Sequence, residues 1–240
     1  NHTDPPKVRV PDDLDAPTDV VDHVVADPLV APFLAEWVDG ADEGFAGEFW
    51  ELDHKRGTYW RWLRGVIGGD PVEDVVDERS IRIEYRPLPT QPSIRDIVGF
   101  QCLVGGLLRG LVAADHPLGD LPRAEAERSF YDVVENGLDA EFAWITADGE
   151  RTSDPETVFA EVFEFARRGL TEQGVDDATA DRYLDPLEAR WAARTTPSRW
   201  KIERAREALA DGATLEAALA TVQDEYVRHS RDHDTFADWL

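Results

Sequence analysis

Two short stretches of the chain hold the residues whose types and spacing could do chemistry together. Arg64 ends the stretch 54–64, and Glu84 and Arg86 lie in the stretch 80–93. A glutamate between guanidinium groups suits a Mg²⁺-nucleotide site, because a carboxylate is a hard oxygen ligand and arginine binds phosphoryl oxygens two at a time. The alternative is a structural row of salt bridges.

These residues require two strands to bring them together. From residue 81 to residue 86 apolar and charged residues alternate, which predicts a strand with one face toward the core, Ile81, Ile83 and Tyr85, and one charged face, Arg82, Glu84 and Arg86. Alternation in the earlier stretch sets Trp60, Trp62 and Arg64 on one face. We therefore predict antiparallel strands near 58–65 and 80–88, with Arg82 and Trp60 as candidate cofactor-binding residues.

The remainder of the chain is predicted to be mostly helical. Ser93 is the expected N-cap of a central buried helix that is apolar nearly all round and whose glycines allow close backbone approach, Gly105, Gly106 and Gly110. Further helices are predicted from Pro122 to about Thr146, from Pro155 to just before Gly174, from about Asp177 to Arg194, from Pro197 to before Gly212, and from the cap Thr214 through His229. The expected fold class is α+β, a small antiparallel sheet packed against about five to six helices. We expect a single domain over 1–240, with a sheet-bearing part at 1–92 and a helical part at 93–240.

Other common kinds of site have little support. His229 and His233 lie four residues apart, but no third ligand is near them. The glycines of 65–69 lack the Lys-Ser/Thr ending of a phosphate loop. Cys102, the single cysteine, lies in an apolar helix and is predicted to be a buried structural thiol, which fits a reducing cytoplasm.

The chain is strongly acidic, with 50 acidic residues against 25 basic ones and a net charge of −25. Arginine predominates among the basic residues, since lysine occurs only at Lys7, Lys55 and Lys201. We interpret this as adaptation to concentrated salt, which screens charge repulsion. The acidity argues against nucleic acid and anionic membrane as partners. The longest apolar stretch, 97–108, contains Gln101, and we expect a cytoplasmic protein.

The chemistry-bearing stretches resemble a known family. The sequence Gly-Thr-Tyr-Trp-Arg-Trp-Leu-Arg at 57–64, then Ile-Glu-Tyr-Arg at 83–86, then a proline-bearing turn into a long apolar helix resembles the second half of the glutamate–cysteine ligase family and its carboxylate–amine ligase relatives. The family pattern is a Gly-Thr-Ile-Trp-Trp-Asp-x-Arg strand followed by Glu-Val-Arg. The helical tail, including 194–198, also resembles the end of such a ligase from a halophilic archaeon.

The resemblance implies roles for the candidate residues. Glu84 would be a Mg²⁺ ligand, Arg86 would hold the transferred phosphoryl group or acyl phosphate, and Arg64 would bind phosphate or a substrate carboxylate. The family reaction uses ATP to phosphorylate a glutamate side-chain carboxylate, and an amine then attacks the acyl phosphate to give an amide. The implied cofactors are Mg²⁺ and ATP, the latter as a substrate, and the implied partner is a small amino-acid substrate.

The family's other metal-binding glutamates lie on a Glu-x-Glu strand, which has no counterpart here before residue 50. The chain also contains no methionine. We therefore expect the C-terminal portion of a longer ligase-like protein, with the N-terminal part or a second copy as a candidate partner. Two hypotheses stand: an ATP-dependent carboxylate–amine ligase-like protein, inactive as this fragment or active at full length, and a non-catalytic halophilic structural or partner-binding domain that retains the ligase scaffold.

Overall fold

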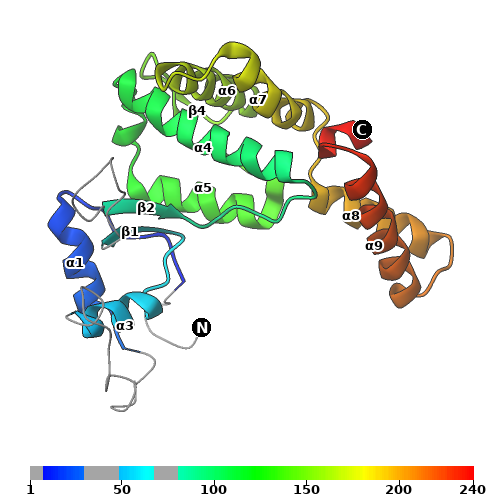
Figure 1. Cartoon of the computed structure of the whole chain (residues 1–240), viewed down its shortest axis with the longest axis horizontal. Coiled ribbons are helices and arrows are strands. Elements are labelled where there is room, and N and C mark those ends of the chain that lie inside the picture. The colour runs from blue at the N-terminus through cyan, green and yellow to red at the C-terminus, as the bar shows by residue number, and fades with distance from the viewer. Residues whose placement is uncertain (1–7, 30–48, 68–80) are drawn as a thin grey trace. The chain divides into compact units, whose positions relative to one another are not determined.

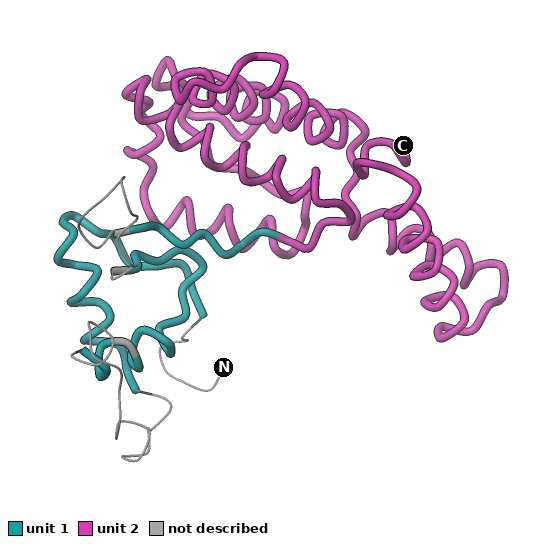
Figure 2. Tube along the Cα trace, viewed as in Figure 1, with its two compact units in different colours: residues 1–88 teal, residues 89–240 magenta. Residues whose placement is uncertain are grey.

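The computed structural model describes residues 8–29, 49–67 and 81–240. The chain divides into two compact units, residues 1–88 and residues 89–240 (Figure 2). The single domain expected over 1–240, with parts at 1–92 and 93–240, stays a prediction.

The described part of the first unit combines helices with a two-stranded sheet (Figure 1). Its elements are α1 (Pro17–Ala26), α3 (Trp50–Thr58), β1 (Leu63–Ile67) and β2 (Ile81–Tyr85). The strands are antiparallel, and their register pairs Arg64 with Glu84 and Val66 with Arg82. The two arginine-bearing stretches therefore pair as the alternation predicted.

The first strand, predicted near 58–65, begins later than expected, and this boundary was wrong. Thr58 is the last residue of α3, and β1 starts only at Leu63. Aromatic and β-branched residues favour a strand here by propensity, but hydrogen bonds close the helix instead. Thr58 Oγ1 donates to the Lys55 carbonyl at 3.0 Å, and Arg64 Nη1 donates to the carbonyls of Arg56 and Tyr59 at 2.9 and 3.0 Å.

The prediction that β2 turns a core face inward was also wrong. Ile83 is 66% exposed and Tyr85 is 43% exposed. The face that they share with Gly65 meets α1 at Gly65, where an added Cβ would lie 2.6 Å from a Val20 methyl group. A two-stranded sheet has too little width for one helix contact to cover the whole face.

The second unit is helical, apart from one short hairpin. Its elements are α4 (Ile94–Ala113), η2 (Pro117–Asp120), α5 (Arg123–Asn136), η3 (Gly137–Asp139), β3 (Trp144–Ile145), β4 (Arg151–Thr152), α6 (Pro155–Glu172), α7 (Asp177–Ala192), α8 (Pro197–Ala210), α9 (Leu215–Asp232) and η4 (Phe236–Trp239). The six helices α4 to α9 and the small sheets confirm the α+β class. Ser93 is the N-cap of α4, as predicted, and its Oγ accepts from the Asp96 N–H at 3.1 Å.

The helix predicted over 122–146 was too long, because α5 ends at Asn136. Gly137 takes a φ of 61°, a conformation that favours glycine and stops the helix. The Asp132 carboxylate then accepts hydrogen bonds from Asn136 Nδ2 and from the Glu141 N–H, which turns the chain away from the helix axis. The hairpin β3–β4 follows, with Trp144 paired to Thr152.

Helix α4 packs closely on α6 through glycine. A Cβ at Gly106 would lie 2.4 Å from the Ala166 carbonyl oxygen, and one at Gly110 would lie 2.0 Å from the Phe165 carbonyl oxygen. The predicted close approach is therefore confirmed for these two residues. It was wrong for Gly105, where an added Cβ would meet nothing within 4 Å.

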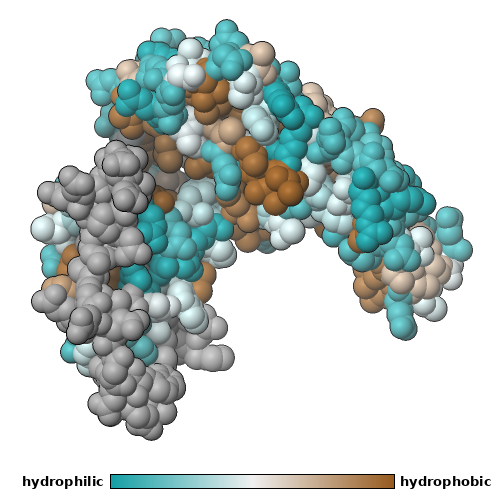
Figure 3. Space-filling view, viewed as in Figure 1, coloured by the Kyte–Doolittle hydropathy of each residue, from teal (hydrophilic) through white to brown (hydrophobic). Residues whose placement is uncertain are grey.

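The opposite side of α4 is exposed and apolar. Helical periodicity places Ile94, Ile97, Leu108 and Val112 away from the packed glycines, and all four are exposed. Apolar atoms gather accordingly on the helical unit in Figure 3. Helix α4 has 20 residues and contains an 18-residue window with a mean hydropathy of 1.5. It is therefore long and apolar enough to cross a bilayer by length and composition alone, a test that the core helix of a soluble protein also passes.

Candidate functional site

The strand register brings the three predicted site residues together. Arg64 on β1 lies opposite Glu84 on β2, and Arg64 Nε contacts Glu84 Oε2 at 2.6 Å. Arg86, just beyond β2, contacts Glu84 Oε1 through its Nε at 3.2 Å. One carboxylate is therefore held between two guanidinium groups, with a net charge of +1 for the cluster.

The two arginines differ in what they have left to offer a ligand. Arg64 is 11% exposed, and besides Glu84 its Nη1 serves the last carbonyls of α3. Arg86 is 33% exposed, and its contact with Glu84 uses Nε alone. Neither terminal nitrogen of Arg86 has a hydrogen-bond partner among the described residues, so this fork can receive an anion.

The electrostatics of Glu84 follow from its two neighbours. Partial burial acts to raise the pKa of this carboxyl group, but the hydrogen bond from Arg64 and the charges of Arg64 and Arg86 outweigh burial and lower the pKa. Glu84 is therefore ionised at neutral pH and fixes the Nε side of both guanidinium groups.

The structure does not bring the other two candidates into this cluster. Trp60 precedes β1 and is exposed, and its Nε1 donates to the Gly57 carbonyl at 2.9 Å. Arg82 lies opposite Val66, is exposed, and takes part in neither ion pair of Glu84. Arg82 lies on the same face of β2 as Glu84, but the residue paired with it on β1, Val66, is apolar.

The described residues do not fit a Mg²⁺ site at Glu84. Both oxygens of this carboxylate already accept from guanidinium groups. Across 8–29, 49–67 and 81–240, no group of three His, Cys, Asp or Glu residues is placed to hold a metal ion. Mg²⁺ and ATP stay predictions of the family resemblance, and no chemical step is derived through the metal.

Sequence reasoning missed the buried ion pair of the first unit. Arg61, which stands where the family pattern has tryptophan, contacts Asp27 at 2.8 Å, and both side chains are 3% exposed. The Arg61 guanidinium also lies 4.3 Å from the centre of the Tyr59 ring. The alternation of residues gave no signal for this buried pair, because it made Arg61 only one charged residue in a predicted strand.

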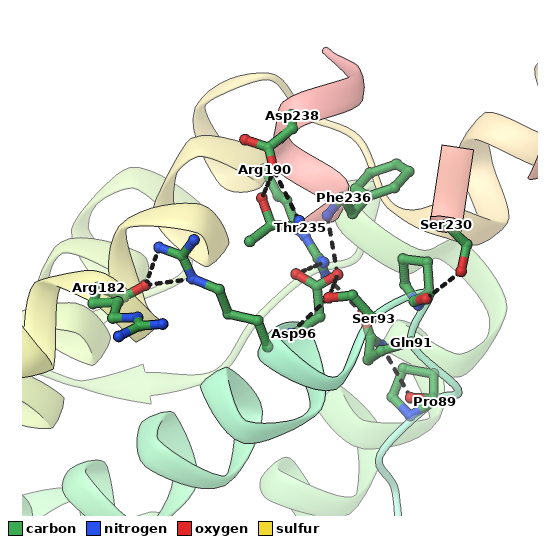
Figure 4. Close-up of polar contacts among 12 residues, drawn as sticks. Pro89, Gln91, Ser93, Asp96, Arg182, Arg190, Ser230, Thr235, Phe236 and Asp238 are labelled. Carbon is green, nitrogen blue, oxygen red and sulfur yellow. Dashed lines mark hydrogen bonds and ion pairs between the residues drawn. The ribbon is translucent and has the colours of Figure 1, made fainter. Parts of the chain in front are cut away.

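A second missed cluster lies in the helical unit (Figure 4). Asp96, in the first turn of α4, is fully buried and lies 2.5 Å from Arg190 Nη2 of α7. Burial lowers the pKa of Arg190, and the charge of Asp96 opposes this effect. The apolar character of its helix was the available signal that the charge of Asp96 needed a buried partner.

Comparison of the chain with protein-family models, with curated proteins and with solved structures finds no match.

Proposed function

We propose that this protein is an ATP-dependent carboxylate–amine ligase-like protein and that Arg86 is its phosphoryl-binding residue. The observation that carries the proposal is the arrangement of Arg86: Glu84 holds its Nε, and within 8–29, 49–67 and 81–240 neither terminal nitrogen has a hydrogen-bond partner, which leaves both available to an anion. Arginine binds phosphoryl oxygens through this planar pair of donors. The sequence motif around these residues supplies the reaction class.

In the proposed reaction the substrate carboxylate attacks the γ-phosphorus of ATP, and ADP leaves. An amine then attacks the resulting acyl phosphate, the C–N bond forms, and inorganic phosphate leaves. Arg86 contributes by binding the transferred phosphoryl group at both stages, where charge-assisted hydrogen bonds stabilise the developing negative charge. Arg64 acts through Glu84, because its Nε is committed to that carboxylate and its Nη1 to α3.

The test is ADP release by the protein at the full length of its native reading frame, in molar KCl with Mg-ATP, glutamate and an amine. We expect Arg86→Gln to lower kcat/KM by about tenfold or more, the cost of one lost charge-assisted hydrogen bond. Glu84→Gln should also impair release, because Arg86 loses its anchor. A wild-type rate in Arg86→Gln would remove Arg86 from the mechanism.

Glu172 provides a matched control for Glu84. It also stands between two arginines, with Arg109 Nε at 3.4 Å and Arg168 Nε at 3.7 Å, but on helices of the second unit. Glu172→Gln removes the same charge from the same kind of cluster, and we expect no change in ADP release.

A second candidate function has an observation of its own. Glu84 and Arg64 satisfy each other and close the end of α3, which is what a structural ion-pair row requires. In that case the chain is a non-catalytic domain with the ligase scaffold. Neither the wild type nor any variant would then release ADP, and Glu84→Gln would change only the free energy of unfolding.

A further inference from the structure

The last residues of the chain close over the buried charge of the helical unit. Phe236 in η4 is fully buried, and its backbone N–H donates to Asp96 Oδ2 at 3.0 Å. Its ring lies 5.0 Å from the Arg190 guanidinium carbon. Figure 4 shows Thr235 and Phe236 meeting Asp96 and Arg190 from the side of η4. Residues 234–240 are called the C-terminal strap below.

Asp96 depends on the strap for part of its hydrogen bonding. Its Oδ2 accepts from Ser93 Oγ at 2.9 Å and from the Phe236 N–H, while Oδ1 faces Arg190. A buried carboxylate is costly unless each of its oxygens has a partner. Release of the strap would take one donor away and expose the ion pair to water.

The same cluster holds the segment that leads into α4. Arg190 Nη1 donates to Gln91 Oε1 at 2.7 Å, and Ser230 Oγ, near the end of α9, donates to the Pro92 carbonyl at 2.6 Å. Residues 89–93 form no helix or strand of their own. Their described tertiary hydrogen bonds therefore run to α7 and α9. The strap follows α9 in the chain and packs against Arg190 of α7.

The strap has internal order that makes it a unit. Asp238 Oδ2 accepts from both the N–H and the hydroxyl of Thr235, at 2.8 and 2.9 Å. The Trp239 ring lies 5.2 Å from the Tyr226 ring and 4.9 Å from the Phe236 ring, between centroids. Loss of the Thr235–Asp238 turn would therefore loosen the whole strap.

We propose that the C-terminal strap is a latch that opens and closes as one unit, and that its closing orders residues 89–96. A segment of seven residues with one fully buried ring opens at a lower free energy than the helical core. Opening uncovers Asp96 and Arg190. Residues 89–93 then become less ordered, because Arg190 is no longer fixed in the position from which it donates to Gln91. Helices α4 and α6 stay packed through Gly106 and Gly110, where the atoms nearest to an added Cβ all belong to α6.

The test is hydrogen–deuterium exchange of the full chain, followed by mass spectrometry. Asp238→Asn weakens the turn of the strap without opening a cavity in the core, and we expect exchange in 89–96 and in 234–240 to speed up together by about tenfold. Exchange in α6 should not change. Asp211→Asn is the matched control, since Asp211 is exposed at the end of α8 and the charge change is the same.

Phe236→Ala provides the second variant and should give the same pattern with a larger effect. Exchange that speeds up in 234–240 alone, with 89–96 unchanged, would overturn the latch. Equal acceleration in α6 in the Asp238→Asn variant would also overturn it, because the strap would then be part of the global core. Neither outcome bears on ADP release, so the latch and the proposed activity fail separately.

Discussion

At the scale of single residues, the chain uses carboxylates in two opposite settings. Glu84 lies at the surface of a small sheet, where it pairs with two arginines and remains partly exposed to solvent. Asp96 is buried and relies on a backbone N–H 140 residues away in sequence. Alternation along a strand could predict the first setting, because it depends on neighbours in one sheet. It could not predict the second, because no local pattern specifies a partner at that separation.

The lowered pKa of Glu84 predicts a pH dependence of stability. A carboxyl group whose pKa is lower in the folded state stabilises the fold above its unfolded pKa, near 4.5, and that contribution is lost as the pH falls through the folded pKa. Glu84→Gln should therefore unfold more easily than the wild type at pH 7. The difference should shrink progressively below about pH 4.5. Urea unfolding across pH 3 to 7 measures this, and a difference that is independent of pH would contradict the assignment.

The buried pair of the helical unit predicts a large effect of removing one partner. Arg190→Met should lower the free energy of unfolding by about 3 to 5 kcal/mol, because the Asp96 charge stays buried without its counter-ion. Arg204→Met is the control: Arg204 pairs with Glu207 at the surface, and its loss should cost no more than about 0.5 kcal/mol. Urea titrations of both variants measure these losses in the free energy of unfolding. Equal losses would show that Asp96 finds another partner.

At the scale of elements, the sequence predicted types better than boundaries. Helix α4 and its Ser93 cap were predictable from apolar character and capping chemistry. The start of β1 was not, because Arg64 closes α3 through contacts with backbone carbonyls. The end of α5 was missed although Gly137, which stops the helix with its positive φ, is a glycine in the sequence. Gly105 shows the same limit, since glycine content alone does not say which side of a helix meets a neighbour.

The glycines of α4 give a paired prediction. Gly110→Ala places a Cβ against the Phe165 carbonyl, which cannot move without shifting α6, and should destabilise the fold by about 1 to 3 kcal/mol or more. Gly105→Ala meets open space and should stabilise the helix by up to about 1 kcal/mol, from propensity alone. Thermal unfolding of the two variants would give shifts of opposite sign. Two shifts of the same sign would contradict the close packing of α4 on α6.

At the scale of the whole molecule, the charge of −25 dominates the response to salt. Ion pairs such as Arg64–Glu84 weaken as salt screens them, but the self-repulsion of a strongly acidic chain weakens as well. Composition alone could predict this property, because net charge does not depend on the fold.

We expect the melting temperature to rise between about 0.1 and 1 M KCl, where the Debye length falls from about 10 to 3 Å. Sucrose at matched osmolality is the control, because it favours compact states without screening charge. A melting temperature that rises equally in sucrose, or not at all in KCl, would contradict adaptation to concentrated salt.

The proposed activity depends most on Arg86 as an anion-binding group that Glu84 holds in place. Calorimetric titration of ATP into the full-length native protein tests this directly, with Arg86→Gln and Glu172→Gln measured beside the wild type. We expect the wild type and Glu172→Gln to bind ATP equally well and Arg86→Gln to bind about tenfold more weakly or worse. Equal affinity of all three proteins, or absence of binding by the wild type, would contradict the proposed role of Arg86.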